Sequence, residues 1–215
     1  SSIERAFEEA QGSCRLMVGY NRRFSPLIAT MKAQLGKIVG PKTFILTMNA
    51  GHIPADHWTQ DIEKGGGRII GEACHYIDLL RFLVGAPITG YTASRIGAAP
   101  GVETADDKAT ITLTFEDGSM GTIHYFANGG RAFPKERIEA FGGDGVLQLD
   151  NFKRLRGFDW KGFRSQRLRS QDKGQKACAA AFVNSIRSGT PSPIPIEEIF
   201  EVARVSIEVA EQLRA

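Results

Sequence analysis

The spacing of apolar residues divides the chain into helix-like and strand-like segments. Residues 3–11 place apolar side chains on one face of a helix, which Gly12 is positioned to end. The apolar run at 14–20 predicts a short buried strand. Because a helix followed by a buried strand is the closing half of an αβ unit, we expect residues 1–22 to be the remnant of a preceding α/β domain in a longer protein.

The next segments differ in their patterns. Ser25 and Pro26 suit the N-cap and the first position of a helix that runs to Leu35. Residues 42–51 predict a strand, and residues 52–67 predict a long polar loop of the kind that often carries functional groups.

The stretch GGGRIIGEACHYIDLLRFLVG, at residues 65–85, predicts a helix that ends at Gly85, before Pro87. Apolar residues recur in it at helical spacing and define one core face: Ile70, Ala73, Ile77, Leu80 and Val84.

After this helix the pattern changes to the alternation that is typical of strands. Residues 109–129 predict a hairpin around an Asp-Gly turn, and residues 136–150 predict a second hairpin around GGDG. Two helices are predicted at the end of the chain, over 176–189 and from Ile196.

This order of elements predicts an α+β fold for a domain over residues 23–215. We expect an open, mostly antiparallel sheet with helices on one face. The other face, carrying Ile111, Leu113 and Phe115 or their neighbours, should pair with another subunit in a homo-oligomer.

The composition is that of a soluble globular protein, with 42% hydrophobic and 24% charged residues. No apolar run approaches the ~18 residues of a membrane span, and no signal peptide opens the chain. Cys14, Cys74 and Cys178 lie far apart and form no CxxC pair. This use of cysteine fits a reducing cytoplasm and argues against a disulfide framework or a structural zinc site.

The net charge of +3 is unevenly distributed along the chain. Residues 153–176 hold nine Lys or Arg and two Asp, which leaves 18 basic and 22 acidic residues elsewhere. The segment is either a solvated loop, which we favour slightly, or a site for an anionic partner. Its aromatic residues also allow single-stranded nucleic acid, but no nucleic-acid-binding fold signature accompanies them.

Candidate chemistry is concentrated in the helix at 65–85. Glu72, His75 and Asp78 lie three residues apart, so we expect neighbours in this series to face each other. The preceding glycines allow a close approach to a ligand. A histidine beside carboxylates can act as a general acid or base. The alternative interpretation is a core histidine whose hydrogen bond is satisfied by Asp78.

A zinc site is a further alternative, with His52, His57, His75 and Glu72 as ligands. Their spacing is irregular and lacks the i, i+4 histidine pair of helical zinc sites, so we expect no metal.

Several segments together resemble a known family. They are VGYNRRFSP after the apolar run, GGGRIIGEACHYIDLLRFLVG, the hairpins, and a final helix after IRSGTPSPI. They resemble the C-terminal domain of the glucose–fructose oxidoreductase / inositol dehydrogenase / MocA family, from about Cys14 to the end. The run from AGHIPADHW to HYIDLL is more specifically similar to a two-part dehydrogenase of polysaccharide biosynthesis.

The resemblance implies a substrate-binding and oligomerisation domain of an oxidoreductase that acts on a sugar, a cyclitol or a related hydroxyl compound. It implies that His75 either acts as the acid or base or positions the substrate hydroxyl. Many members of the family carry Asp where this sequence has Gly71, and Glu72, one residue later, is the candidate to replace it in a somewhat different geometry. The substrate is implied to contact a further set of residues: Asn21, Arg22, Arg23, His57, Trp58 and Asp78.

The resemblance also implies NAD or NADP as cofactor of the full-length enzyme and identifies residues 1–22 as the end of a Rossmann domain. Neither the glycine-rich dinucleotide loop nor the lysine of an EKP motif is present in this sequence. Two other functions stay open: a non-catalytic binding or assembly module, favoured by Gly71, and an anion-binding domain that uses residues 153–176.

Overall fold

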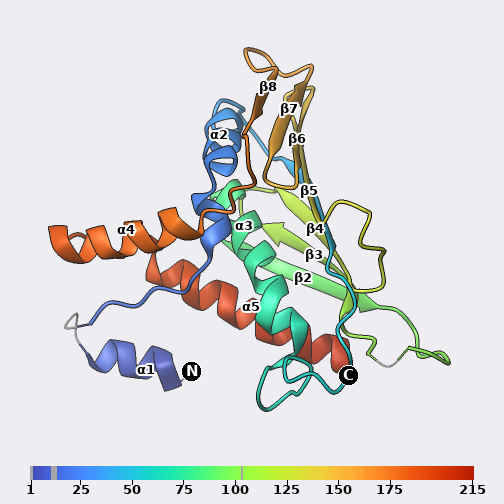
Figure 1. The fold of residues 1–215 in the computed structure, drawn as a ribbon. Helices are drawn as coiled ribbons and strands as arrows, with labels where there is room; N and C mark the ends of the chain where they lie inside the picture. Colours follow the sequence, from blue (N-terminus) through green and yellow to red (C-terminus); the bar gives the residue numbers. More distant parts are fainter. Residues whose placement is uncertain (1, 11–13, 103) are drawn as a thin grey trace.

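The structure is a computed structural model and describes residues 2–10, 14–102 and 104–215. Its centre is an eight-stranded sheet in the order β2-β3-β4-β1-β5-β6-β7-β8 (Figure 1). The strands are β1 (Thr43–Asn49), β2 (Ile88–Arg95), β3 (Lys108–Phe115), β4 (Met120–Phe126), β5 (Glu136–Gly142), β6 (Gly145–Asp150), β7 (Arg154–Phe158) and β8 (Ser165–Arg167). Neighbouring strands run antiparallel except β1 and β4, which are parallel.

The described part of the chain also contains helices, some of which cover one face of this sheet. They are α1 (Ser2–Glu9), α2 (Pro26–Leu35), α3 (Cys74–Val84), α4 (Gln175–Ser188) and α5 (Ile196–Arg214), with a 3₁₀ turn η1 (Asn21–Phe24) and a π-helical turn η2 (Ile69–Ala73). α3 and α5 lie against the sheet, whereas α4 projects away from it (Figure 1). The predicted α+β fold, with its open and mostly antiparallel sheet, is confirmed.

The first segment differs from the prediction. Residues 2–9 form the expected helix, and Phe7 packs against Phe200 of α5 with ring centroids 6.1 Å apart. Residues 14–20 are not a strand, because no strand in the described part of the chain pairs with their backbone. Gly12, the predicted helix end, lies outside the described residues.

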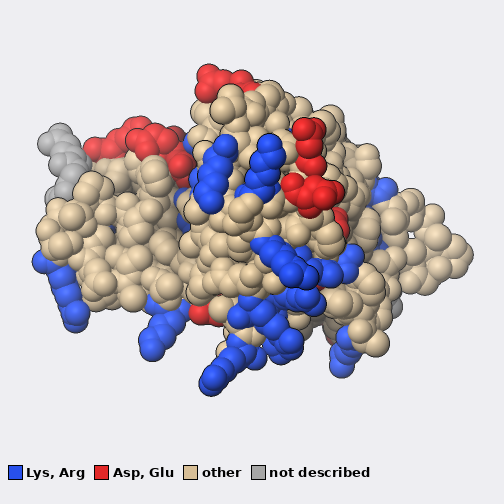
Figure 2. Space-filling view, turned by 90° about the horizontal axis from the view of Figure 1, so that it is seen from above, with Lys and Arg blue, Asp and Glu red and all other residues tan. Residues whose placement is uncertain are grey.

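The sheet is also larger than the sequence pattern predicted. β2 follows α3 directly and was missed, because its side chains are only partly buried and do not alternate clearly. The basic segment 153–176 is not a simple loop: it contributes β7 and β8 to the sheet edge. Figure 2 shows Lys and Arg side chains clustered on the face seen from above, where the tip formed by β6, β7 and β8 lies.

The open face of the sheet carries the sequence neighbours of Ile111, Leu113 and Phe115, and these three residues point to the other face. Ile111, Leu113 and Phe115 are buried under the helices. The opposite face has rows of threonine, such as Thr112 hydrogen-bonded to Thr122 (3.1 Å). It also exposes large apolar side chains on four strands: Ile45, Met120, Phe141 and Phe158.

A glycine sets the distance between α3 and the sheet. A Cβ atom at Gly121 in β4 would lie 2.8 Å from a methyl carbon of Leu80 and 3.2 Å from Cβ of Phe44. Interiors are close-packed, so a side chain here would push the helix away from the strands.

We therefore expect Gly121→Ala to lower the free energy of unfolding by about 1–3 kcal/mol, as overpacked cores do. Gly19→Ala is the matched control, because a Cβ at Gly19 meets no atom within 4 Å. Urea unfolding of both variants tests this, and equal midpoints for the two would contradict it.

Candidate active site

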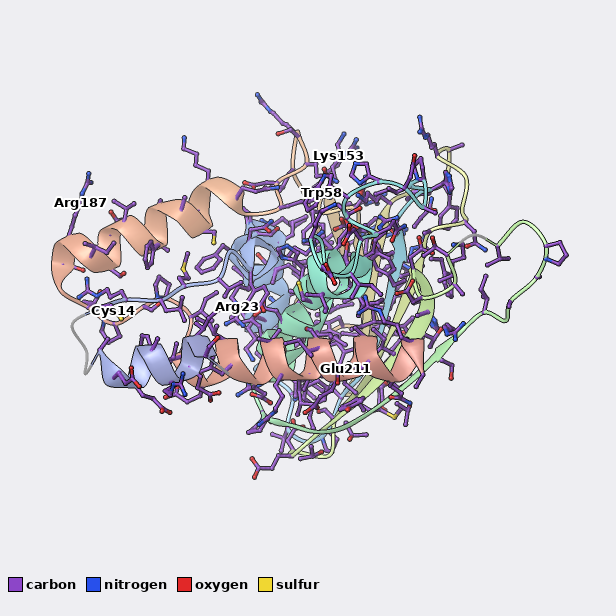
Figure 3. The ribbon with its side chains drawn as sticks, turned by 90° about the horizontal axis from the view of Figure 1, so that it is seen from below. Cys14, Arg23, Trp58, Lys153, Arg187 and Glu211 are labelled. Carbon is purple, nitrogen blue, oxygen red and sulfur yellow. The ribbon has the colours of Figure 1, made fainter. Side chains whose placement is uncertain are left out.

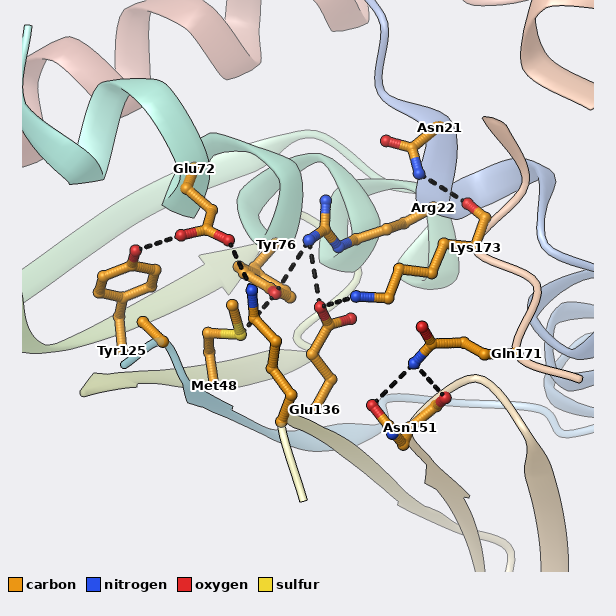
Figure 4. Close-up of polar contacts among 12 residues, drawn as sticks. Asn21, Arg22, Met48, Glu72, Tyr76, Tyr125, Glu136, Asn151, Gln171 and Lys173 are labelled. Atoms are coloured by element: carbon orange, nitrogen blue, oxygen red, sulfur yellow. Dashed lines mark hydrogen bonds and ion pairs between the residues drawn. The ribbon is translucent and has the colours of Figure 1, made fainter. Parts of the chain in front are cut away.

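A buried ionic cluster joins η1, α3, β5 and the loop before α4 (Figure 4). Arg22 Nη2 lies 3.1 Å from the hydroxyl of Tyr76 and 3.3 Å from Oε1 of Glu136. Lys173 Nζ donates to the same Glu136 oxygen at 2.7 Å. Because Glu136 is 1% exposed and Arg22 is 6% exposed, the charges face each other out of bulk water.

The backbone of the loop before α4 holds Lys173 in this cluster. Asn21 Nδ2 donates to the carbonyl of Lys173 (2.7 Å), and Ser25 Oγ donates to the carbonyl of Asp172 (2.8 Å). Gly174 has φ 82°, and a Cβ there would collide with the carbonyl oxygen of Asn21. Asn21, for which the resemblance implied substrate contact, thus fixes the loop that carries Lys173.

A second buried pair lies beside the first. Arg23 donates two hydrogen bonds to Asp78, one of 3.1 Å from Nε, and its Nη1 donates to Glu198 of α5 at 2.8 Å. The side chains of Arg23 and Asp78 are 4% and 0% exposed. Burial raises the pKa of Asp78, and Arg23 opposes that effect. Both residues are therefore occupied by protein contacts, and their implied role in substrate binding stays a prediction.

Glu72 lies in the turn η2, just before α3, and its carboxylate contacts three donors. Tyr125 donates to Oε2 at 2.5 Å and Arg68 Nη2 at 2.9 Å, while Lys135 Nζ lies 3.4 Å from Oε1. Burial acts to raise the pKa of Glu72, but Tyr125, Lys135 and Arg68 outweigh it, and the pKa is lowered. Glu72 is thus a fixed carboxylate.

The expectation that neighbours in the series Glu72, His75 and Asp78 face each other stays a prediction, and the charge of Glu72 does act on His75. Glu72 lies in the π-helical turn η2, whose extra residue per turn changes the spacing before α3 begins. Glu72 contacts Tyr125 and Asp78 contacts Arg23, and neither carboxylate bonds to the Nδ1 atom of His75.

The side chain of His75 has no hydrogen bond to any described residue, and its Nδ1 is buried. Its ring packs edge-on against Tyr20, with centroids 5.8 Å apart. Burial and the nearby charge of Arg22 lower the pKa of His75 to about 4, so the imidazole is neutral at pH 7. The alternative of a core histidine satisfied by Asp78 does not hold, because Asp78 bonds to Arg23.

Two further buried polar atoms lack a partner among the described residues: Arg22 Nε and Glu136 Oε2. Buried polar groups are nearly always hydrogen-bonded, so unpartnered atoms on neighbouring residues suit a binding site. Sequence reasoning missed Tyr76, Glu136 and Lys173. Lys173 lay in the basic segment and Glu136 opened a predicted strand, but neither position carried a signal of its own.

His57 and Trp58 lie in the loop before η2, away from this cluster. Trp58 is 61% exposed, and His57 Nδ1 lies 2.9 Å from the hydroxyl of Thr59 (Trp58 and Arg23 are labelled in Figure 3). No contact joins either side chain to the cluster, so their implied role in substrate binding stays a prediction.

The glycine run before η2 does not form a cofactor cradle. A Cβ at Gly65 would lie 2.5 Å from the carbonyl oxygen of Trp58, and Arg214 Nη2 donates to the carbonyl of Gly66 at 2.5 Å. These glycines allow close approach of protein atoms. The residues here therefore do not fit the pyrophosphate of a dinucleotide.

The described ranges also contain no group of three His, Cys, Asp or Glu that could hold a metal ion. In the same part of the chain, no helix is long and apolar enough to cross a membrane.

Residues 31–148 match the family described as the GFO/IDH/MocA C-terminal domain. The chain belongs to the GFO/IDH/MocA family. This GFO/IDH/MocA chain is 32% identical over 143 residues to the uncharacterized oxidoreductase YrbE of Bacillus subtilis, covering 63% of this chain and 40% of that protein. It is 27% identical over 126 residues to inositol 2-dehydrogenase 2 of Paenarthrobacter aurescens, covering 55% and 35%.

Solved structures of oxidoreductases share its fold. UDP-N-acetylglucosamine 3-dehydrogenase GnnA from Acidithiobacillus ferrooxidans superposes with a TM-score of 0.75 at 20% identity, covering 98% of this chain and 65% of that one. Aldose-aldose oxidoreductase from Caulobacter crescentus gives 0.78 at 16% identity, covering 98% and 64%. For the two curated relatives, from Bacillus subtilis and Paenarthrobacter aurescens, the matched part of this chain covers 40% and 35% of their length.

The Arg23–Asp78 pair should dominate the stability of this region. Asp78→Ala removes two of the acceptors of the buried Arg23 and leaves it only Glu198, so we expect a loss of about 1–3 kcal/mol in the free energy of unfolding. The double variant Arg23→Met, Asp78→Leu should lose much less, because it removes both charges.

Glu9→Ala is the control, since it removes an exposed Arg5–Glu9 pair and should cost less than about 0.5 kcal/mol. Equal losses in urea unfolding for Asp78→Ala and Glu9→Ala would contradict the assignment.

Proposed function

We propose that this chain is the substrate-binding and oligomerisation domain of an NAD(P)-dependent oxidoreductase that acts on a sugar, a cyclitol or a related hydroxyl compound. The observation that carries the proposal is the neutral His75, which has no partner among the described residues and lies near a buried cluster of Arg22, Glu136 and Lys173. The named relatives, an inositol dehydrogenase and a nucleotide-sugar dehydrogenase, support the substrate class.

His75 is the proposed acid or base. An alcohol must lose its hydroxyl proton as its hydride leaves, and a neutral imidazole can accept that proton. The charges of Glu72 and Glu136 favour the imidazolium that results, whereas Arg22 disfavours it. Glu72 acts here through its charge, because its oxygens are held by Tyr125, Arg68 and Lys135.

Arg22 and Lys173 are the proposed contacts for the substrate's other oxygens. Their shared partner Glu136 keeps both cations in fixed positions. NAD or NADP is inferred from the family, and the residues described here provide no site for it. We assign residues 1–22 to the end of a Rossmann domain and residues 23–215 to the substrate domain, in a cytoplasmic enzyme.

A non-catalytic assembly module is the second candidate. Gly71 stands where the resemblance implied an acidic residue, and the open sheet face exposes Ile45, Met120, Phe141 and Phe158. An exposed apolar face of this kind suits a second copy of the chain, which is compatible with either function.

In the full-length enzyme, His75→Ala should lower kcat by about 10²–10⁴, the usual contribution of a positioned base. Its melting temperature should stay close to that of the wild type, because the side chain of His75 makes no hydrogen bond to a described residue. His124→Ala is the control: this histidine lies on the open face, 3.1 Å from the hydroxyl of Thr110, and should leave kcat unchanged. A large drop in melting temperature with normal turnover for His75→Ala would refute the catalytic role.

The wild-type chain should sediment as an oligomer, and Ile45→Asp should shift it to monomer by placing a charge on the open face. Val39→Asp is the matched control, because Val39 is 99% exposed in the loop between α2 and β1 and belongs to no strand of that face. A wild-type monomer at high micromolar concentration would argue against this interface.

A further inference from the structure

A pocket of about 250 Å³ lies where β1 ends beside the loop between β4 and β5. Its cationic side chains are Arg131 and Lys135, and no carboxylate lines it. Arg131 makes no ion pair or hydrogen bond with the described residues, and Lys135 makes one long ion pair of 3.4 Å. The pocket therefore carries positive charge that its own walls do not neutralise.

The loop that carries Arg131 also has backbone donors without an acceptor. The amides of Gly129, Gly130 and Arg131 donate to no acceptor in the described part of the chain. Successive free amides in a glycine-rich turn form an anion-binding concavity. Phosphate and carboxylate groups are the anions that such donors and arginine recognise together.

Asn49 holds this loop in place. Its Nδ2 donates to the carbonyls of Gly130 (2.8 Å) and Phe133 (3.3 Å), and its Oδ1 is buried without a partner. A Cβ at Gly129 would collide with this Oδ1, so the loop requires glycine there. The amides are therefore fixed in position before any ligand binds.

We propose that this pocket binds the anionic group, a phosphate or carboxylate, of the enzyme's small-molecule substrate. The proposal rests on the proposed function, because Lys135 lines the pocket and also contacts Glu72, which lies one turn from His75. An anion seated between Arg131 and Lys135 would hold the rest of the substrate next to the candidate site.

Amide-detected NMR titration of the chain with inorganic pyrophosphate tests the proposal. We expect saturable shifts at the amides of Gly129, Gly130 and Arg131, and at least a tenfold weaker affinity for Arg131→Gln. Arg187→Gln is the matched control, because Arg187 is exposed at the free end of α4 (Figure 3), and it should bind like the wild type. Absence of saturable shifts, or an equal loss of affinity in both variants, would overturn the proposal.

A second variant separates the backbone from the charge. Gly129→Ala keeps the charge but displaces the loop, and it should weaken binding at least tenfold; unchanged binding would overturn the role of the amides. A parallel titration with glucuronate identifies the anion, since tighter binding at the same amides would assign a carboxylate. These titrations do not measure turnover. The anion pocket can therefore fail its test while His75→Ala still lowers kcat, and the pocket can bind an anion while His75→Ala leaves kcat unchanged.

Discussion

The buried pair of Arg23 and Asp78 is the contact on which the site depends. It fixes η1 to α3, and the additional bond from Arg23 to Glu198 fixes both to α5. Charges that are removed from water stay stable only when they remain paired, so these three elements cannot shift independently. Arg22 follows from this constraint, because it is the residue before Arg23, and His75 lies one turn before Asp78 on the same helix. The Arg23–Asp78 pair thereby sets the positions of Arg22 and His75, whose Nε and Nδ1 atoms lack a partner among the described residues.

The residues around His75 share one electrostatic arrangement. Glu136 lies between Arg22 and Lys173, and Glu72 lies between Arg68 and Lys135, so each carboxylate is held by two cations. Such fixed charges cost no reorganisation when a substrate binds, which is the property that makes preorganised sites effective. His75 differs from them because its side chain is partly buried, neutral and without a hydrogen bond to a described residue. A proton can therefore be added to its imidazole without breaking a hydrogen bond to a described residue.

The two faces of the sheet differ for a related reason. The face under α3 and α5 is apolar, and Gly121 allows the helix to approach it closely. The opposite face alternates threonine rows with exposed apolar side chains, a mixture that an interface with another subunit would bury. The edge at which β1 ends, with the loop between β4 and β5, connects this sheet to the helix through Lys135 and Glu72. The proposed anion pocket lies at that edge.

The sequence by itself determined the α+β class, the two hairpins and most helix boundaries, because apolar periodicity and Gly, Pro and Asp-Gly signals are local. It also singled out His75. It did not predict β2, β7 and β8, because these strands, at or next to a sheet edge, are only partly buried and show no clear alternation. It predicted a strand at 14–20 that finds no partner in the described chain. Only the tertiary structure decided that Asp78 pairs with Arg23, that Tyr125 holds Glu72, and that Glu136 and Lys173 join Arg22 in one buried cluster. Those contacts join residues that are between 37 and 114 positions apart in the sequence, and a local pattern carries no information about such contacts.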